Sequence, residues 1–149
     1  MNYHNNIFIG ADHAGFEAKK ELKTYLKAAG FSVEDLGDLV LDQNDDYPDF
    51  IVPVAKAVTE NKDSKGIVIG GSGQGEAMAA NKVKGIRAAV IYDEYSAKMS
   101  REHNNANVAA FGSRTTDIEK IKELTMTWLN TPFSREERHE RRIEKLNNL

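Results

Sequence analysis

Short apolar runs alternate along this chain with stretches in which apolar residues recur every three or four positions. The runs have the length of buried strands and cover residues 6–10, 31–36, 65–69, 85–92 and 107–111. The stretches with helical spacing cover residues 16–29, 48–58, 76–82, 94–103, 115–130 and 134–146. The pattern therefore predicts five strands, each followed by a helix, and a further helix towards the end of the chain.

The predicted strands are too apolar to leave one face of a sheet in water, so both faces must be covered by helices. This predicts a doubly wound, Rossmann-like α/β fold with a five-stranded parallel sheet. We expect one domain over residues 1–149, with a C-terminal helix at about 134–146. Ligands bind such sheets at the carboxyl ends of the strands. The loops that we expect there hold Asp12, His13, Ser72, Glu76, His103, Asn104 and Arg114.

Composition narrows the classes of function. A net charge of -3 gives no electrostatic reason to expect nucleic acid as a partner. Without cysteine the chain has no disulfide, thiolate ligand or thiol nucleophile. The first six residues lack the basic region of a secretory signal and no segment is apolar enough for a membrane span, so we expect a cytoplasmic protein. The acidic stretch 42–46 is expected to be a surface loop.

The segment Gly70–Gly75, here called the glycine loop, joins a predicted strand to a predicted helix. Four of its six residues are glycines, which let backbone N–H groups turn towards a bound anion at a helix N-terminus. A tight turn that only packs the helix is the alternative. Glu76 follows in the first helical turn, where an acid also suits the helix dipole. Together they would place a carboxylate base beside donors that stabilise an oxyanion.

Other candidates have equally ordinary alternatives. Asp12 and His13 follow the first strand and could open a sugar ring or hold a phosphate, although Asp12 could simply cap a helix. His103 at a helix C-terminus could be only a favourable dipole contact. Arg138 and Arg142 share a helix face and could bind a phosphate, or belong to a solvated surface. The histidines lack the spacing of a metal-binding motif, so no metal is expected.

Several motifs, taken together and in order, resemble the type B ribose-5-phosphate isomerases. This family also includes galactose-6-phosphate and allose-6-phosphate isomerases. The resemblance runs from about Ile7 to Arg142. The segments that carry it are Gly10–Phe16 with Lys19, Asp46–Pro48, Gly70–Glu76 with Ala79–Lys82, Gly85–Ala88, Ser100–Asn104 and Phe111–Arg114.

The resemblance implies a cofactor-independent interconversion of ribose 5-phosphate and ribulose 5-phosphate, as in the pentose phosphate pathway. It also implies a homodimer, or a dimer of dimers, whose active sites use residues of both subunits. One branch of the family has a cysteine base just ahead of the glycine loop, where this chain has Gly70. Another branch has a glutamate directly after the loop. Glu76 matches that branch and is the base that the resemblance selects.

The same resemblance implies the other roles. The enediolate would be held by Gly71, Ser72, Gly73, Gln74 and Gly75, with Ser72 assisting proton exchange between its oxygens. Asp12 and His103 would help to open the furanose ring. The phosphate would be bound by His13, Arg114, Arg138 and Arg142, while Tyr47 and Asn104 would line the site. A hexose 6-phosphate substrate and a non-catalytic flavodoxin-like binding module remain the alternatives.

Overall fold

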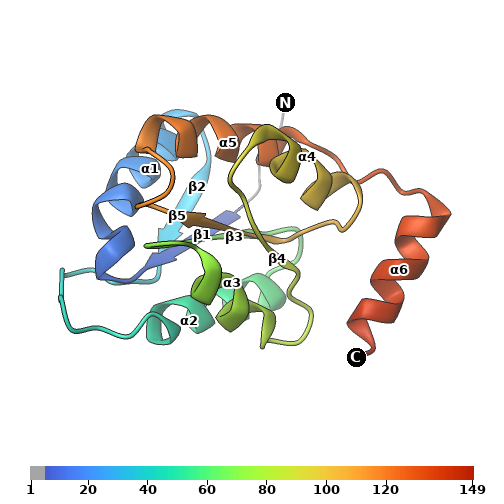
Figure 1. The fold of residues 1–149 in the computed structure, drawn as a ribbon, viewed down its shortest axis with the longest axis horizontal. Helices are drawn as coiled ribbons and strands as arrows, with labels where there is room; N and C mark the ends of the chain where they lie inside the picture. Colours follow the sequence, from blue (N-terminus) through green and yellow to red (C-terminus); the bar gives the residue numbers. More distant parts are fainter. Residues whose placement is uncertain (1–5) are drawn as a thin grey trace.

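The computed structural model describes residues 6–149, which form a parallel five-stranded sheet between two layers of helices (Figure 1). The strands are β1 (Asn6–Ala11), β2 (Ser32–Asp35), β3 (Lys65–Gly70), β4 (Ala88–Val90) and β5 (Val108–Gly112). The helices are α1 (Phe16–Ala28), α2 (Pro48–Glu60), α3 (Gln74–Asn81), α4 (Glu94–Glu102), α5 (Ile118–Asn130) and α6 (Glu137–Asn147). The sheet order is β2-β1-β3-β5-β4, with Ile67 of β3 opposite Ile9 and Ala109. The predicted fold class is confirmed.

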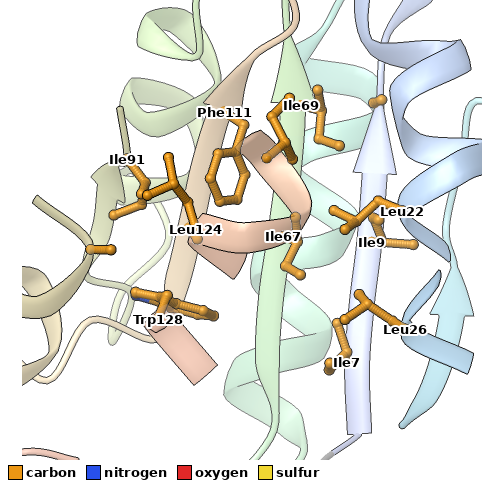
Figure 2. Packing of buried hydrophobic residues seen from close by; sticks show 14 of the residues in the cluster. Ile7, Ile9, Leu22, Leu26, Ile67, Ile69, Ile91, Phe111, Leu124 and Trp128 are labelled. Atoms are coloured by element: carbon orange, nitrogen blue, oxygen red, sulfur yellow. The ribbon is translucent and has the colours of Figure 1, made fainter. Parts of the chain in front are cut away.

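Each face of the sheet has its own apolar core. Helices α1, α4 and α5 cover one face, where isoleucines of β1 and β3 meet Leu22, Leu124 and Trp128 (Figure 2). Helices α2 and α3 cover the other face, where Val54 and Ala80 pack against Val68. Alternate residues of the central strands therefore enter opposite cores, which is why these strands are apolar throughout.

The boundaries differ from the predicted ones at two instructive places. Helix α3 begins at Gln74, two residues earlier than predicted, because Gly73 adopts a left-handed conformation (φ 79°) and serves as the N-cap. Strand β4 spans only 88–90 because the preceding turn satisfies its backbone with side chains. There the backbone N–H of Arg87 donates to Asn107 Oδ1 at 2.8 Å.

The topology creates a crevice at the carboxyl edge of the sheet. The chain leaves β1 and β5 towards the face covered by α1 and α5, whereas it leaves β3 towards the opposite face and α3. Because β3 lies between β1 and β5, the loop after β3 is flanked by two loops that turn the other way. Ligands bind doubly wound sheets at such a switch point.

Helix α6 lies outside the two layers of helices that cover the sheet (Figure 1), and Arg87 donates a hydrogen bond to its Asn147 Oδ1 at 3.2 Å. Its one buried residue is His139, whose Nδ1 lies 2.7 Å from Ser134 Oγ in the segment that leads into the helix. Most of its other side chains face solvent. Among residues 6–149, no helix has the length and apolar character needed to cross a membrane.

Candidate active site

A cavity of about 400 Å³ opens at the switch point. It is lined by residues of the loops after β1, β3 and β5 and of the segment before α2: Asp12, His13, Ala14, Tyr47, Gly71, Ser72, Gly75, Glu76, Arg114 and Thr115. Its volume lies in the range of small-molecule sites. The structure therefore brings together most of the residues that the sequence placed at this edge.

The glycine loop allows unusually close approaches. A Cβ atom on Gly70 would overlap Oε1 and Cδ of Glu76, so the Glu76 carboxylate occupies the volume of a side chain at position 70. A Cβ on Gly75 would lie 2.7 Å from Cζ of Tyr47, which covers that residue. The glycines at these two positions therefore make room for an acid and an aromatic ring.

Glu76 is buried, with 4% of its surface exposed, in the first turn of α3. Burial raises the pKa of its carboxyl group, and the nearby charge of Asp12 acts in the same direction, while backbone N–H groups oppose the shift. A carboxylate whose pKa is raised is a stronger base than one in water. The raised pKa of Glu76, together with its place in the lining of the cavity, suits a group that abstracts a proton.

Asp12 caps the helical turn after β1. This is the capping role that the sequence offered as the alternative to a role in binding sugar or phosphate. Its Oδ1 accepts hydrogen bonds from the backbone N–H groups of Ala14 at 3.0 Å and Gly15 at 3.3 Å. The residue still lines the cavity, so capping and a place in the site are compatible. The cap fixes the direction in which the adjacent His13 leaves the backbone.

His13 forms a close pair with Asp45, a partner that the sequence did not suggest. Nδ1 of His13 lies 2.6 Å from Asp45 Oδ1, which also accepts the backbone N–H of His13 at 3.2 Å. This hydrogen bond raises the pKa of the imidazole, whereas the nearby Arg114 lowers it. Although burial opposes the shift, the hydrogen bonds from His13 hold the pKa of Asp45 below its usual range.

The prediction of a surface loop over 42–46 is confirmed, but Asp45 turns its side chain inward. Its side chain is 4% exposed, and its Oδ2 is buried without a hydrogen-bond partner among residues 6–149. The expectation holds for Asp42 and Asn44, which are exposed. In a run of polar residues, the sequence does not indicate which side chain is buried. The closeness of this run to the Asp46–Pro48 motif is the one hint available.

Asp12, His13 and Asp45 also offer one ligand atom each within 4.8 Å of one another. Such a group of oxygen and nitrogen donors can in principle hold a divalent cation. In the present arrangement, however, Nδ1 of His13 and Oδ1 of Asp45 face each other at hydrogen-bonding distance. The group is therefore arranged as a hydrogen-bonded cluster.

Arg114 is held in the site by hydrogen bonds between loops. Its backbone N–H donates to Gly71 O at 3.0 Å, and the N–H of Ser113 donates to Gly70 O at 2.8 Å. Ser113 Oγ also donates to Ala14 O at 2.6 Å. These bonds join the loops after β1, β3 and β5 into one unit, with the guanidinium group of Arg114 next to Gly71.

Three members of the glycine loop do not line the cavity. The Glu76 carboxylate covers Gly70, Gly73 is buried as the cap of α3, and the Gln74 side chain is exposed. Gly71, Ser72 and Gly75 do line it, and Ser72 Oγ accepts the backbone N–H of Gln74 at 3.3 Å. The N-terminus of α3 still directs its partial positive charge towards the cavity.

Four predicted residues lie elsewhere. His103 caps the C-terminus of α4, and Asn104 follows it. Because α4 runs back across the sheet, both lie at the amino edge, opposite to the edge predicted for them. Asn104 O there accepts a hydrogen bond from Arg87, just before β4. Arg138 and Arg142 belong to α6, whose His139 lies 4.4 Å from the ring of His103.

The arrangement in the cavity combines a buried base, a loop suited to anions and two cationic groups. Glu76 can take a proton, and the glycine loop with the α3 terminus can stabilise an oxyanion. Arg114 and a protonated His13 can bind a phosphate. This set suits proton transfer next to the carbonyl group of a phosphorylated compound.

Comparisons with known proteins agree with this chemistry. Residues 7–146 match the family model described as ribose/galactose isomerase. The chain is 41% identical over 140 residues to ribose-5-phosphate isomerase B of Mycobacterium tuberculosis H37Rv, covering 94% of this chain and 86% of that protein. It is equally identical, at 41%, to ribose-5-phosphate isomerase B of Escherichia coli K12, with 94% and 93% covered.

A solved structure is similarly close. Ribose-5-phosphate isomerase B of Mycoplasma genitalium with bound ribulose-5-phosphate superposes with a TM-score of 0.92 at 44% identity. The match covers 96% of this chain and 94% of that one.

Proposed function

Because the chain belongs to the ribose/galactose isomerase family, we propose that it is an isomerase that interconverts ribose 5-phosphate and ribulose 5-phosphate. The relatives named above carry this activity in their names, and one of them binds ribulose-5-phosphate. The observation in this chain that supports the proposal most directly is the buried Glu76 carboxylate, which fills the space above Gly70 beside the glycine loop.

Glu76 acts as the base. In the open-chain aldose, its carboxylate takes the proton from C2, and the electrons of the C–H bond form the enediolate while charge develops on the C1 oxygen. Backbone N–H groups of the glycine loop stabilise that charge. The protonated Glu76 then returns the proton to C1, which gives the ketose. Ser72 assists the exchange of the oxygen protons, and no electrons leave the substrate.

The remaining roles fall to groups around this centre. Asp12 and His103 help to open the furanose ring. Gly71 and Gly75 line the enediolate subsite, and Gly73 and Gln74 hold the backbone of that loop in place. His13, Arg114, Arg138 and Arg142 bind the phosphate, while Tyr47 and Asn104 line the sugar subsite. His103, Asn104, Arg138 and Arg142 would come from a second copy of the chain.

A homodimer, alone or as a dimer of dimers, is accordingly part of the proposal. Its support is the separation of two sets of residues within one chain: the cavity lies at the carboxyl edge of the sheet, and the C-terminal end of α4 at the amino edge. Helix α6 contacts its own chain mainly through His139, which packs on His103, and Asn147, which accepts a hydrogen bond from Arg87, so most of its surface can pack on another chain. One interface could then complete two sites by symmetry.

We further propose that residues 1–149 act as one isomerase domain in the cytoplasm. Sugar phosphates are dianions, and charged groups cross a bilayer at a high energetic cost, so such substrates stay in the compartment where they are made.

The proposed function is tested by assaying the purified protein on ribose 5-phosphate, with allose 6-phosphate and galactose 6-phosphate in parallel. We expect the highest kcat/KM for ribose 5-phosphate. A clear preference for a hexose phosphate would support the proposed isomerase chemistry but identify a different substrate. A folded protein that is inactive on all three would refute the isomerase and favour a binding module, which a search for bound flavin would then examine.

The two arginines of α6 should affect binding more than chemistry. Arg138→Ala and Arg142→Ala are expected to raise KM for ribose 5-phosphate by about tenfold or more each, because a charge-assisted bond to phosphate is lost while the base is unchanged. Steady-state kinetics measure both constants. Arg141→Ala, on the same exposed helix, is the control. Unchanged kinetics in both variants would show that α6 does not contribute to phosphate binding.

Asp45 is expected to set the pH range over which His13 binds phosphate. Asp45→Asn removes the partner that raises the pKa of His13, and therefore the imidazolium loses its proton at lower pH. The charge on His13 is present below its pKa and disappears as pH rises through it. KM should consequently begin to rise at a lower pH in the variant than in the wild type.

The pH profile of KM distinguishes this role from a structural one. Asp42→Asn, in the exposed part of the same loop, is the matched control and should leave the profile in place. An Asp45→Asn variant with a higher KM at every pH and no displacement of the profile would contradict the proposed effect on the charge of His13.

A further inference from the structure

A second pocket, of about 510 Å³, lies at the amino edge of the sheet, opposite to the catalytic cavity. Three basic residues from three different segments line it: Lys65 at the start of β3, Arg101 in α4 and Arg135 in the segment before α6. None of them belongs to the proposed catalytic machinery. The pocket therefore requires an explanation of its own.

Arg101 provides the most informative observation. The residue is 7% exposed, and its guanidinium group donates only to neutral acceptors: Nε to Thr131 O at 3.2 Å, and Nη1 to Asn105 Oδ1 at 2.8 Å and Ala106 O at 2.6 Å. Within residues 6–149 it forms no ion pair. A buried charge is normally compensated by an opposite charge. The Trp128 ring, with its centroid 5.9 Å from Cζ, is a further neutral partner. Arg101 is thus held rigidly, and no negative charge pairs with it among residues 6–149.

Lys65 adds a second uncompensated charge. Its ammonium group forms no hydrogen bond or ion pair with the part of the chain that is described. Burial, and then the charge of Arg101, lower the pKa of Lys65, as expected where two cations share a poorly hydrated space. An anion between the two groups would favour the charged form of Lys65 and so oppose both effects.

The acidic residues nearby supply only part of that negative charge: the charge of Asp63 raises the pKa of Lys65, against the two larger effects. Asp63 and Glu140 line the pocket, yet neither forms an ion pair within the described residues, and both are exposed. Three cations and two carboxylates leave the pocket with a positive balance. The least exposed charged groups are those of Arg101, which is buried, and Lys65, which is half-buried, whereas both carboxylates are exposed.

The backbone around the pocket is also unusual. The three residues other than glycine with positive φ in the described chain are Asp63 (62°), Asn105 (46°) and Arg135 (59°), and all three line this pocket. Left-handed backbone at residues with side chains is uncommon and concentrates at binding sites. Here it turns three separate segments towards one space.

We propose that this pocket binds a compact phosphorylated dianion through Lys65, Arg101 and Arg135. Arg101 can offer its remaining N–H donors in a fixed plane, whereas Lys65 and Arg135 offer charge from two other segments of the chain. The pocket is large enough for a phosphate group with a few attached carbons. Glu140 lies two positions from both Arg138 and Arg142 and therefore on a different side of α6, so the two phosphate sites do not share side chains.

The test uses two probes and two variants. Inorganic phosphate and glycerol 3-phosphate, which is not an aldose, are titrated by calorimetry into the full chain in a phosphate-free buffer. We expect two classes of site per chain, the second with a dissociation constant below about 1 mM. Lys65→Met, which keeps the packing and removes the charge, should lose the second class, whereas Lys62→Met in the preceding exposed turn should keep it.

The outcomes separate this proposal from the proposed function. Lys65→Met should isomerise ribose 5-phosphate as well as the wild type in the phosphate-free buffer, because Lys65 is absent from the catalytic cavity. In crystals soaked with tungstate, a phosphate analogue, an anion is expected between Lys65, Arg101 and Arg135. Tighter binding of glycerol 3-phosphate than of phosphate would identify a metabolite as the ligand. The absence of a second class of site, or its survival in Lys65→Met, would refute the proposal.

Discussion

Glu76→Gln is expected to lower kcat for ribose 5-phosphate by about 10²- to 10⁴-fold, the range that a positioned general base contributes. Glutamine keeps the size of the side chain and its place above Gly70 but cannot accept a proton from carbon. KM should change little, because the phosphate is bound by other groups. Steady-state kinetics with the purified variant give both constants, and a melting curve verifies that it is folded.

Glu17→Gln is the matched control for this substitution. Glu17 also lies in the first turn of a helix that follows a strand of the sheet, but it is exposed. It should therefore retain wild-type kcat. Glu76→Gln with more than about half of the wild-type kcat would exclude Glu76 as the base.

The pH dependence of the wild type gives an independent test. Glu76 must be ionised to act, and its pKa is raised by burial, so kcat/KM should fall as the pH drops through that raised value. The loss should therefore begin at a higher pH than it would for an exposed glutamate. A profile that stays flat down to the ordinary pKa of a glutamate, about 4.3, would show that another group is the base.

The sequence predicted the sheet well because local and long-range signals agree there. Apolar runs such as 65–69 must be buried on both faces, and only a parallel sheet between helices achieves that. The sequence predicted the start of α3 less well, since a glycine at position 75 is typical of a loop. In the structure Gly75 is helical, and the absence of a side chain there allows close contact with Tyr47. Glycine is ambiguous because flexibility and close packing both select it.

Residues of the site were predictable where a strand directly precedes them. Asp12, Ser72 and Arg114 meet because the carboxyl ends of parallel strands share one edge. His103 could not be placed in this way, because it follows a helix and a helix returns to the other edge. Asp45 could not be singled out beyond its closeness to the Asp46–Pro48 motif, since burial of one acid in a polar loop depends on a partner that is distant in sequence.

Gly70→Ala is expected to lower kcat by about 10²-fold, although alanine adds no polar group. The new Cβ would overlap the Glu76 carboxylate, which must move out of position, and a displacement of about 1 Å in a catalytic group can cost this much. Gly66→Ala, in the same strand, would meet only valine side chains at 3.0–3.1 Å, so it should reduce stability without a comparable effect on kcat.

The overlap also predicts that positions 70 and 76 can exchange roles. Gly70→Cys alone should be impaired like Gly70→Ala, because the two side chains compete for one volume. Adding Glu76→Ala empties that volume, and the thiol then lies where the carboxylate was. The double variant should recover activity relative to Glu76→Ala alone, and its activity should rise with pH towards the thiol pKa of about 8.5.

Gly70→Ser with Glu76→Ala is the control, since a hydroxyl of similar size is too weak an acid to form the base. Equal inactivity of the cysteine and serine variants would mean that the volume above Gly70 does not by itself define the position of the base.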